Sequence, residues 1–166
     1  EDAVADFFEC HVTVCDAADR LAAPLPEGLG DPLFLSPDAG AVELAEAVRD
    51  AYGGGDVDFF EKTRHSGTEV EISPSDTDAA GRDVVLVDDI IATGSTMSEA
   101  VAHIADDGAD RVFAACVHPL LAGNARVKLE HAGIDRIVGT DTVEGDVSRV
   151  SVAPIVAAAV EAVEVA

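Results

Sequence analysis

A chain of 166 residues is long enough to form one α/β domain with a substantial core, and it is short for two full domains. Its 33 acidic residues outnumber 10 basic ones, which gives a net charge of −23. This balance argues against a nucleic-acid partner, because a phosphate backbone requires a basic protein face, and it also disfavours an acidic membrane surface.

The acidic residues are spread along the chain instead of forming a tail, and 48% of all residues are apolar. Long runs of Val, Ile and Leu can drive collapse, so the charge does not indicate disorder. A dispersed acidic surface over an ordinary core is typical of adaptation to high salt, where screening makes self-repulsion tolerable. We therefore expect a halophilic protein that folds markedly better in molar potassium chloride. A melting curve indifferent to salt would contradict this expectation.

Neither the cysteines nor the apolar segments indicate a secreted or membrane-bound protein. Cys10, Cys15 and Cys116 have no spacing typical of metal ligands or of a disulfide framework. No apolar stretch approaches the roughly 20 residues that span a bilayer, and the first residues lack a signal segment. We predict a cytoplasmic protein with no membrane partner.

The first part of the chain differs from the rest in composition. Residues 1–31 contain several Pro and Gly residues and predict a linking segment, whereas residues 32–166 predict a folded domain. In chain order we expect a strand at 32–35, a helix at 41–51, and two short strands at 58–61 and 69–72 on either side of a polar loop at 62–68.

The uninterrupted apolar run at 84–87 predicts a central strand that is buried on both faces. The remaining expected elements are a helix at 95–107 ended by Gly108, strands at 111–116, 136–139 and 150–152, a helix at 124–132 ended by Gly133, and a helix at 154–163. Strands and helices that alternate in this way predict an α/β, doubly wound and mainly parallel sheet. Ligands of such sheets bind beyond the carboxyl ends of the strands, at a switch in strand order. The loops in question begin at Ser36, Asp88, His118 and Thr140.

The loop that follows the central strand combines two kinds of polar group. Asp88 and Asp89 come at the end of the strand, and the turn Thr93–Gly94–Ser95–Thr96 opens the next helix. Two carboxylates can bind vicinal hydroxyls, and a helix N-terminus with hydroxyl side chains can bind a phosphate. Together they fit a sugar phosphate. The residues alone leave open a second interpretation, in which a solvated pair of aspartates precedes a capped helix.

The segment VVLVDDIIATGST, residues 84–96, resembles the phosphoribosyl-pyrophosphate signature of the type I phosphoribosyltransferase fold. The resemblance implies that Asp88 and Asp89 bind the 2- and 3-hydroxyls of ribose, and that Thr93, Gly94, Ser95 and Thr96 bind its 5-phosphate. The signature does not separate transferases, which consume phosphoribosyl pyrophosphate, from the pyrophosphokinases that make it.

Two further segments resemble the ribose-phosphate pyrophosphokinase family. Residues 36–40, SPDAG, are similar to a family loop whose aspartate binds magnesium, which implies that Asp38 holds Mg²⁺. Residues 60–64, FEKTR, resemble a loop that closes over the transferring phosphates, which implies catalytic roles for Lys62 and Arg64. The later segments 118–123 and 140–142 fit the family less closely, and the role of His118 stays open between substrate contact and turn capping.

The resemblance implies an enzyme, a ribose-phosphate diphosphokinase that transfers pyrophosphate from ATP to ribose 5-phosphate and releases AMP. It also implies a homo-oligomer and a C-terminal portion, because family members carry a further N-terminal domain that supplies much of the ATP site and that nothing here matches. Ala92 stands where many relatives have an acid, so no role is assigned to that position. Two alternative hypotheses stay open. One is a phosphoribosyltransferase acting on a nucleobase, and the other is a non-catalytic pyrophosphokinase-associated subunit.

Overall fold

A computed structural model describes residues 12–66, 69–74 and 78–164, with the side chains of 61–77 and of residue 164 outside the description. The strands are β1 (Leu33–Ser36), β2 (Asp56–Ser66), β3 (Glu69–Pro74), β4 (Asp83–Ile90), β5 (Arg111–His118), β6 (Arg136–Thr140) and β7 (Ser148–Val150). The helices are α2 (Ala18–Ala22), the short 3₁₀ helix η1 (Ala39–Ala41), α3 (Val42–Tyr52), α4 (Ser95–Asp106), α5 (Ala125–Ala132) and α6 (Ala153–Glu164).

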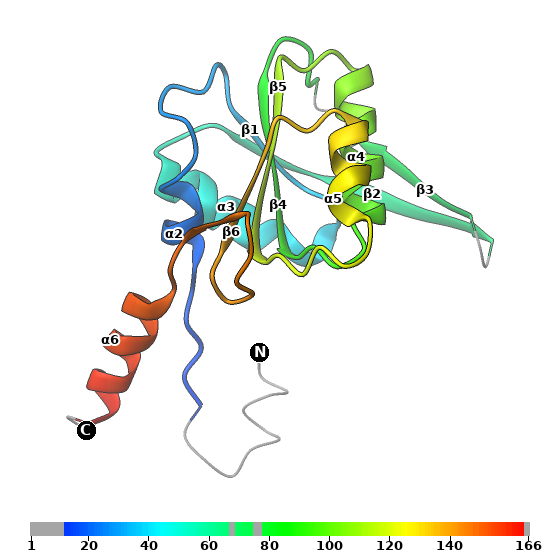
Figure 1. Cartoon of the computed structure of the whole chain (residues 1–166). Helices are drawn as coiled ribbons and strands as arrows, with labels where there is room; N and C mark the ends of the chain where they lie inside the picture. The colour runs from blue at the N-terminus through cyan, green and yellow to red at the C-terminus, as the bar shows by residue number, and fades with distance from the viewer. Residues whose placement is uncertain (1–11, 67–68, 75–77, 165–166) are drawn as a thin grey trace.

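The strands form one sheet in the order β3-β2-β1-β4-β5-β6-β7, and every neighbouring pair is parallel except β2 and β3. Helices α2 and α3 lie on one face of the sheet, and α4 and α5 lie on the other (Figure 1). The predicted doubly wound, mainly parallel α/β fold is therefore confirmed. The chain passes from β1 outward to β2 and later returns to β4 on the other side of β1, which places the switch in strand order between β1 and β4.

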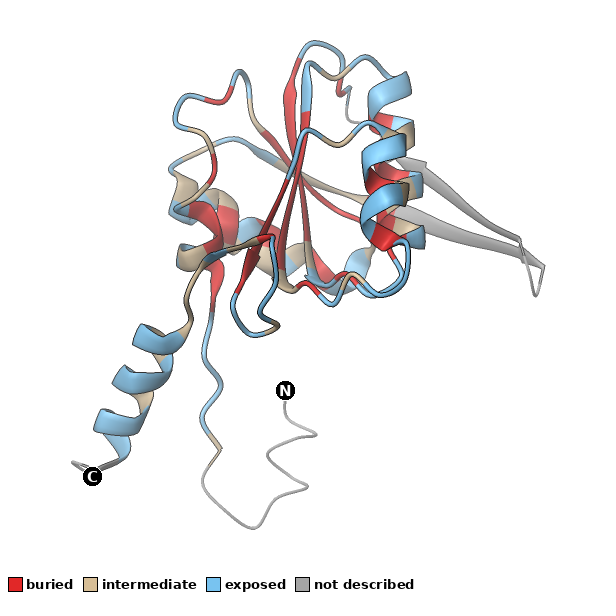
Figure 2. Ribbon diagram, viewed as in Figure 1, coloured by how far each residue is buried: buried red, intermediate tan, exposed pale blue. Residues whose placement is uncertain are grey.

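The central strand β4 contributes side chains to two separate cores. Val84 and Leu86 pack on the side of α4 and α5, whereas Val85 and Val87 pack on the side of α2 and α3. Successive side chains of a strand point to opposite faces, so an apolar run without alternation is what a strand covered on both faces requires. Figure 2 shows the resulting band of buried residues through the middle of the sheet.

Helix α4, whose first residues belong to the predicted phosphate-binding turn, lies where the sequence predicts a helix. Met97, Val101 and Ile104 of α4 are buried against the sheet. The helix ends before Gly108, whose φ of 87° lies in the left-handed region that favours glycine. A rigid α4 therefore fixes the position of its own N-terminus at the edge of the sheet.

The predicted polar loop at 62–68 is wrong over residues 62–66, because β2 runs on to Ser66 and pairs antiparallel with β3. Cross-strand hydrogen bonds satisfy this backbone, and a polar strand lacks the apolar pattern used to find strands. Residues 67–68 lie outside the described part of the chain.

Two smaller differences concern the start and the end of the chain. Helix α2 was not predicted, and its Leu21 is fully buried in the core beside α3. The last strand was expected at 150–152, but β7 ends at Val150, because the Val152 amide leaves the sheet and donates to Asp141 (2.8 Å). Helix α2 lies before residue 31, yet it packs with the sheet into one unit. The division of the chain at residue 31 into a linking segment and a folded domain stays a prediction.

Helix α6 extends away from the sheet and its described residues are mostly exposed (Figures 1 and 2). No helix among the described residues is both long and apolar enough to cross a membrane.

Candidate functional site

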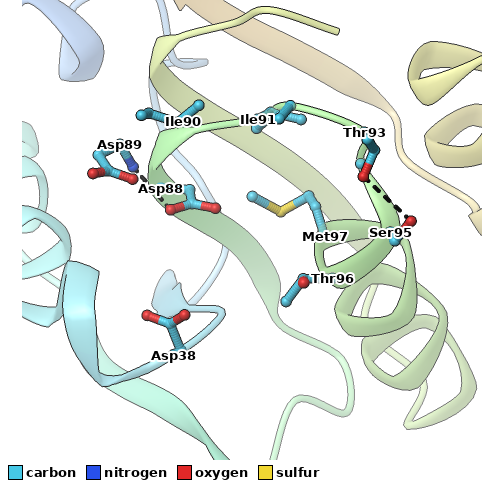
Figure 3. Close-up of a pocket in the computed structure, with 11 residues that line it drawn as sticks. Asp38, Asp88, Asp89, Ile90, Ile91, Thr93, Ser95, Thr96 and Met97 are labelled. Atoms are coloured by element: carbon cyan, nitrogen blue, oxygen red, sulfur yellow. Dashed lines mark hydrogen bonds between the residues drawn. The ribbon is translucent and has the colours of Figure 1, made fainter. Parts of the chain in front are cut away.

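A cavity of about 270 Å³ opens at the carboxyl ends of β1 and β4, where the strand order switches. Its walls come from the loop after β1, the end of β4 and the first turn of α4 (Figure 3). The lining residues are Asp38, Asp88, Asp89, Ile90, Ile91, Ala92, Thr93, Gly94, Ser95, Thr96 and Met97. The structure thus brings all the candidate substrate- and metal-binding residues of the sequence analysis into one cavity.

Asp88 and Asp89 lie near the carboxyl end of β4, and their environments differ. Asp88 is half-buried and accepts a hydrogen bond from the backbone amide of Asp89 (2.9 Å), whereas Asp89 is exposed. Burial raises the pKa of Asp88, and the charges of Asp89 and Asp38 raise it further, to about 7 from an ordinary value of 3.8. No basic side chain lines this cavity among the described residues. Asp88 therefore lies close to other carboxylates, whose charges add to the effect of burial.

A buried thiol forms hydrogen bonds to the backbone of this carboxylate segment. Cys116 of β5 is fully buried, and burial raises its pKa to about 12, so it stays a protonated thiol. Its sulfur accepts from the Ile91 amide (3.2 Å) and its S–H donates to the Asp89 carbonyl (3.4 Å). Cys116 thus ties the loop after β4 to the neighbouring strand.

The turn that opens α4 presents hydroxyls and free backbone amides to the cavity. Gly94 precedes the helix with φ 69°, and no side chain caps the first turn. The hydroxyls of Thr93 and Ser95 lie 3.4 Å apart on the turn (Figure 3). A helix N-terminus with uncapped N–H groups attracts anions, and the adjacent hydroxyls add donors. The turn can therefore bind a phosphate.

Gly94 is required here for a second reason, which is the close approach of α5. A Cβ atom added at Gly94 would lie 3.2 Å from the Cβ of Ala125 and 3.3 Å from its backbone. Lys128, one turn further along α5, donates to Ser95 Oγ (3.0 Å) and to the Thr93 carbonyl (3.4 Å). No local pattern in the sequence points to this lysine, because the contact depends on how α5 packs against α4.

Asp38 reaches the same cavity from the other side of the strand switch. It follows β1 in an extended conformation and its Oδ1 accepts from the Gly40 amide (2.8 Å), while Ser36 Oγ donates to its carbonyl. In Figure 3 its carboxylate faces Asp88. Asp38 therefore shares the acidic end of the cavity with the β4 pair.

The donors in this cavity fit a magnesium ion that is held partly by substrate. Among the described residues, no group of three or more His, Cys, Asp or Glu side chains forms a metal cage. Mg²⁺ usually takes one or two carboxylates together with waters and substrate phosphates, so such a cage is not required. Burial and the negative charges of neighbouring carboxylates raise the pKa of Asp88. A divalent cation in the cavity would offset those negative charges.

The two predicted catalytic cations lie on β2. Lys62 is opposite Ile72 of β3, and Arg64 is opposite Val70. Their side chains are outside the described part of the structure, so whether they approach the cavity stays a prediction.

His118 ends β5, the strand next to β4. Its Nδ1 lies 2.8 Å from the Thr142 hydroxyl, which in turn donates to the Val117 carbonyl (2.6 Å). His118 also lines a second cavity, of about 580 Å³, which shares Asp89 with the first. The imidazole therefore links the loops after β5 and β6 and faces a space beside the candidate site.

Comparison with known proteins gives a consistent result. The family model described as the phosphoribosyl transferase domain matches residues 11–153. A curated ribose-phosphate pyrophosphokinase from Halobacterium salinarum is 58% identical over 157 residues, which are 95% of this chain and 55% of the relative. One from Methanosarcina mazei is 44% identical over 160 residues, 96% of this chain and 54% of the relative. The chain thus spans about half the length of these relatives.

Solved structures show the same likeness. The structure of phosphoribosylpyrophosphate synthetase from Mycobacterium smegmatis has a TM-score of 0.80 and 29% identity, and the match covers 99% of this chain and 56% of the other. A hypoxanthine-guanine phosphoribosyltransferase from Bacillus anthracis has a TM-score of 0.55 and 16% identity, and covers 68% of this chain and 75% of the other, which shows a shared fold alone. The resemblance to ribose-phosphate pyrophosphokinases stated from the sequence is confirmed.

Proposed function

The chain belongs to the phosphoribosyl transferase domain family, and we propose that it is the ribose 5-phosphate-binding part of a ribose-phosphate diphosphokinase. One observation carries the proposal: Asp88 and Asp89 face the same cavity as the Thr93–Thr96 turn, with Asp38 opposite. This arrangement supports recognition of a phosphorylated sugar together with a metal-bound polyphosphate.

In the proposed complex, Asp88 and Asp89 accept hydrogen bonds from the 2- and 3-hydroxyls of ribose. Each ionised carboxylate offers two acceptor oxygens, and vicinal diols present two donors at matching spacing. The 5-phosphate lies on the turn formed by Thr93, Gly94, Ser95 and Thr96, where amides and hydroxyls donate to its oxygens. The sugar is thus held at both ends, with its 1-hydroxyl directed toward Asp38.

The proposed reaction moves a pyrophosphoryl group from ATP. The ribose 1-hydroxyl oxygen bonds to the β-phosphorus, the bond from that phosphorus to the oxygen bridging to the α-phosphate breaks, AMP leaves, and the hydroxyl proton passes to solvent. Such transfers depend mainly on positioning and on neutralising charge. Bound Mg²⁺, held by Asp38, would supply part of that neutralisation. Lys62 and Arg64 are proposed to neutralise the transferring group, as an ammonium and a planar guanidinium respectively.

The remaining parts of the proposal concern the second substrate, the assembly of the protein, its location and its adaptation to salt. ATP is the second substrate of the proposed reaction, and the chain spans about half the length of the relatives named for that reaction. Assembly into a homo-oligomer, location in the cytoplasm and adaptation to high salt are part of the same proposal. The dispersed charge of −23 supports the last of these.

The proposal is tested by calorimetric titration of the chain in high salt with magnesium, using ribose 5-phosphate and, separately, ATP. We expect ribose 5-phosphate to bind and the Asp88→Asn/Asp89→Asn double variant to lose that binding. Asp106→Asn/Asp107→Asn, an exposed pair of carboxylates at the far end of α4, is the matched control and should bind as the parent does. A folded chain that binds neither ribose 5-phosphate nor phosphoribosyl pyrophosphate would refute the site.

A second assay separates synthesis from transfer to a nucleobase. The protein is incubated either with ribose 5-phosphate and ATP or with phosphoribosyl pyrophosphate and a purine or pyrimidine base. AMP release in the first mixture alone supports the diphosphokinase. Nucleotide formed in the second mixture alone would replace it with a phosphoribosyltransferase, and turnover in neither would favour the non-catalytic subunit.

A further inference from the structure

The cavity that would hold a doubly charged phosphate is lined by three aspartates and by no basic side chain among the described residues. Among the described residues, the cavity offers the anion the backbone amides and hydroxyls of the turn, beside these carboxylates. A cation close behind the Thr93–Thr96 turn would reduce the repulsion between the anion and these carboxylates, because the electrostatic effect of a charge does not require direct contact.

Lys128 occupies that position. Its ammonium donates to Ser95 Oγ at 3.0 Å and to the Thr93 carbonyl at 3.4 Å. Both acceptors belong to the turn proposed to bind the 5-phosphate. The lysine therefore contacts the turn from the side of α5.

The lysine is held there by the packing of its helix. Ala125 and Leu129 of α5 are fully buried, and Ala125 lies against Gly94. Lys128 stands between them in sequence, on a helix whose first turn is fixed to the phosphate turn. Its side chain is half-buried.

The partners of Lys128 differ from those of Arg126, another cation on α5. Arg126 pairs with two carboxylates, Glu130 (2.8 Å) and Asp146. Among the described side chains, Lys128 forms no ion pair, although the chain has 33 acidic residues. No carboxylate among the described side chains therefore offsets its positive charge.

The hydrogen-bond chemistry gives the contact a direction. An ammonium group can only donate, so Ser95 Oγ must accept from Lys128. The Ser95 hydroxyl hydrogen is then left to donate elsewhere, to Thr93 Oγ1 or to a ligand in the cavity. Lys128 thus orients the serine as a donor toward an anion.

We propose that Lys128 is a phosphate-positioning residue, which orients the Ser95 hydroxyl toward the 5-phosphate and offsets the charge of that phosphate. The inference rests on the proposed binding of ribose 5-phosphate and extends it to a residue outside the signature segment. It assigns the lysine to the phosphate end of the substrate and gives it no part at the ribose hydroxyls.

The test compares Lys128→Gln, Lys128→Arg and the control Arg126→Gln, which removes the same charge from the same helix. Each variant of the chain is titrated with ribose 5-phosphate and with inorganic phosphate at constant ionic strength, and its melting temperature is recorded. We expect Lys128→Gln to bind both ligands about tenfold more weakly. Lys128→Arg should stay within about threefold of the parent, because it keeps charge and donors. The control should bind as the parent does.

The outcomes separate this inference from the function on which it rests. If the parent binds ribose 5-phosphate and Lys128→Gln binds it as tightly as Arg126→Gln does, the role of Lys128 is refuted and the proposed function stands. If the parent binds only inorganic phosphate and that binding depends on Lys128, the anion role stands and the sugar assignment falls. A parent chain that is folded and binds neither ligand refutes both.

Discussion

The two ends of β4 hold aspartates in opposite electrostatic environments. At the amino end, Asp83 is buried, pairs with both nitrogens of the Arg111 fork and accepts from the Gly30 amide (2.6 Å). The Arg111 hydrogen bonds hold the pKa of Asp83 below its ordinary value, although burial acts the other way. At the carboxyl end, burial and neighbouring carboxylates raise the pKa of Asp88 to about 7.

The difference separates a carboxylate that stabilises the fold from one that is available for a ligand. Asp83 has its charge satisfied within the protein, as buried charges require. Asp88 is close to other acids, which destabilises the folded chain unless a cation or hydroxyl donors are bound. Perturbed carboxylates of this kind in a cavity are typical of functional sites.

The largest expected effect comes from Asp88→Asn. We expect ribose 5-phosphate binding to fall by about 100-fold, because a half-buried acceptor of a charge-assisted hydrogen bond is lost. The same change should raise the melting temperature at pH 8, since it removes a repelled charge. Titration and thermal unfolding of one sample measure both. A variant that binds poorly and is also less stable at pH 8 would contradict the comparison.

The sign of the pH dependence follows from the direction of the shift. Because the pKa of Asp88 is higher in the folded chain than its ordinary 3.8, the folded chain binds more protons between about pH 4 and 7. Stability from this group is present below that window and is lost as the pH rises through it. Denaturant unfolding at several pH values should show this loss in the parent and a flatter profile in Asp88→Asn.

At the other end of the strand, Asp83→Asn should lower the free energy of unfolding by about 2 kcal/mol, because the amide cannot replace a charged partner in a buried pair. Ribose 5-phosphate affinity of the folded fraction should change little. The lowered pKa of Asp83 means that its contribution is present at neutral pH and is lost as the pH falls through the folded value. An unchanged urea midpoint at pH 7 would refute the structural role of Asp83.

Gly94→Ala alters the phosphate turn while leaving every carboxylate in place. A Cβ at φ 69° is strained, and here it would also press on Ala125, so we expect a loss of roughly 1–2 kcal/mol in unfolding free energy. Binding of inorganic phosphate should weaken together with stability. Gly145→Ala is the control, because a Cβ there meets nothing within 4 Å. Equal effects of the two substitutions would show that the turn is not constrained.

The smallest stability effect is expected from Asp89→Asn. Asp89 is exposed, so its substitution should change the free energy of unfolding by less than about 0.5 kcal/mol. Ribose 5-phosphate affinity should nevertheless fall by roughly tenfold, through the loss of an acceptor for one hydroxyl. Affinity equal to that of the parent would assign the sugar to Asp88 alone.

Much of this arrangement could be predicted from local sequence. The run at 84–87 predicted a strand buried on both faces, and the polar residues after it and after the 32–35 run were expected to meet beyond the carboxyl ends of the strands. Both follow from short-range pattern and from the rules of parallel sheets. The roles of the site residues stay predictions.

Other features depend on packing that no local pattern encodes. Helix α2 has five residues, too few for an apolar period to emerge, and it is held by burial of Leu21. The extension of β2 to Ser66 depends on its pairing with β3. The contact of Lys128 with Ser95 depends on how α5 lies on α4, and these residues are far apart in sequence.

The most direct test of the central claim is a crystal structure of the chain with ribose 5-phosphate and magnesium. The account predicts the 5-phosphate on the Thr93–Thr96 turn and the 2- and 3-hydroxyls against Asp88 and Asp89. The chain also has a cavity of about 220 Å³ lined by Arg126, Arg136 and Arg149, next to β7. Phosphate bound in that cavity, with the turn at 93–96 empty, would contradict the account.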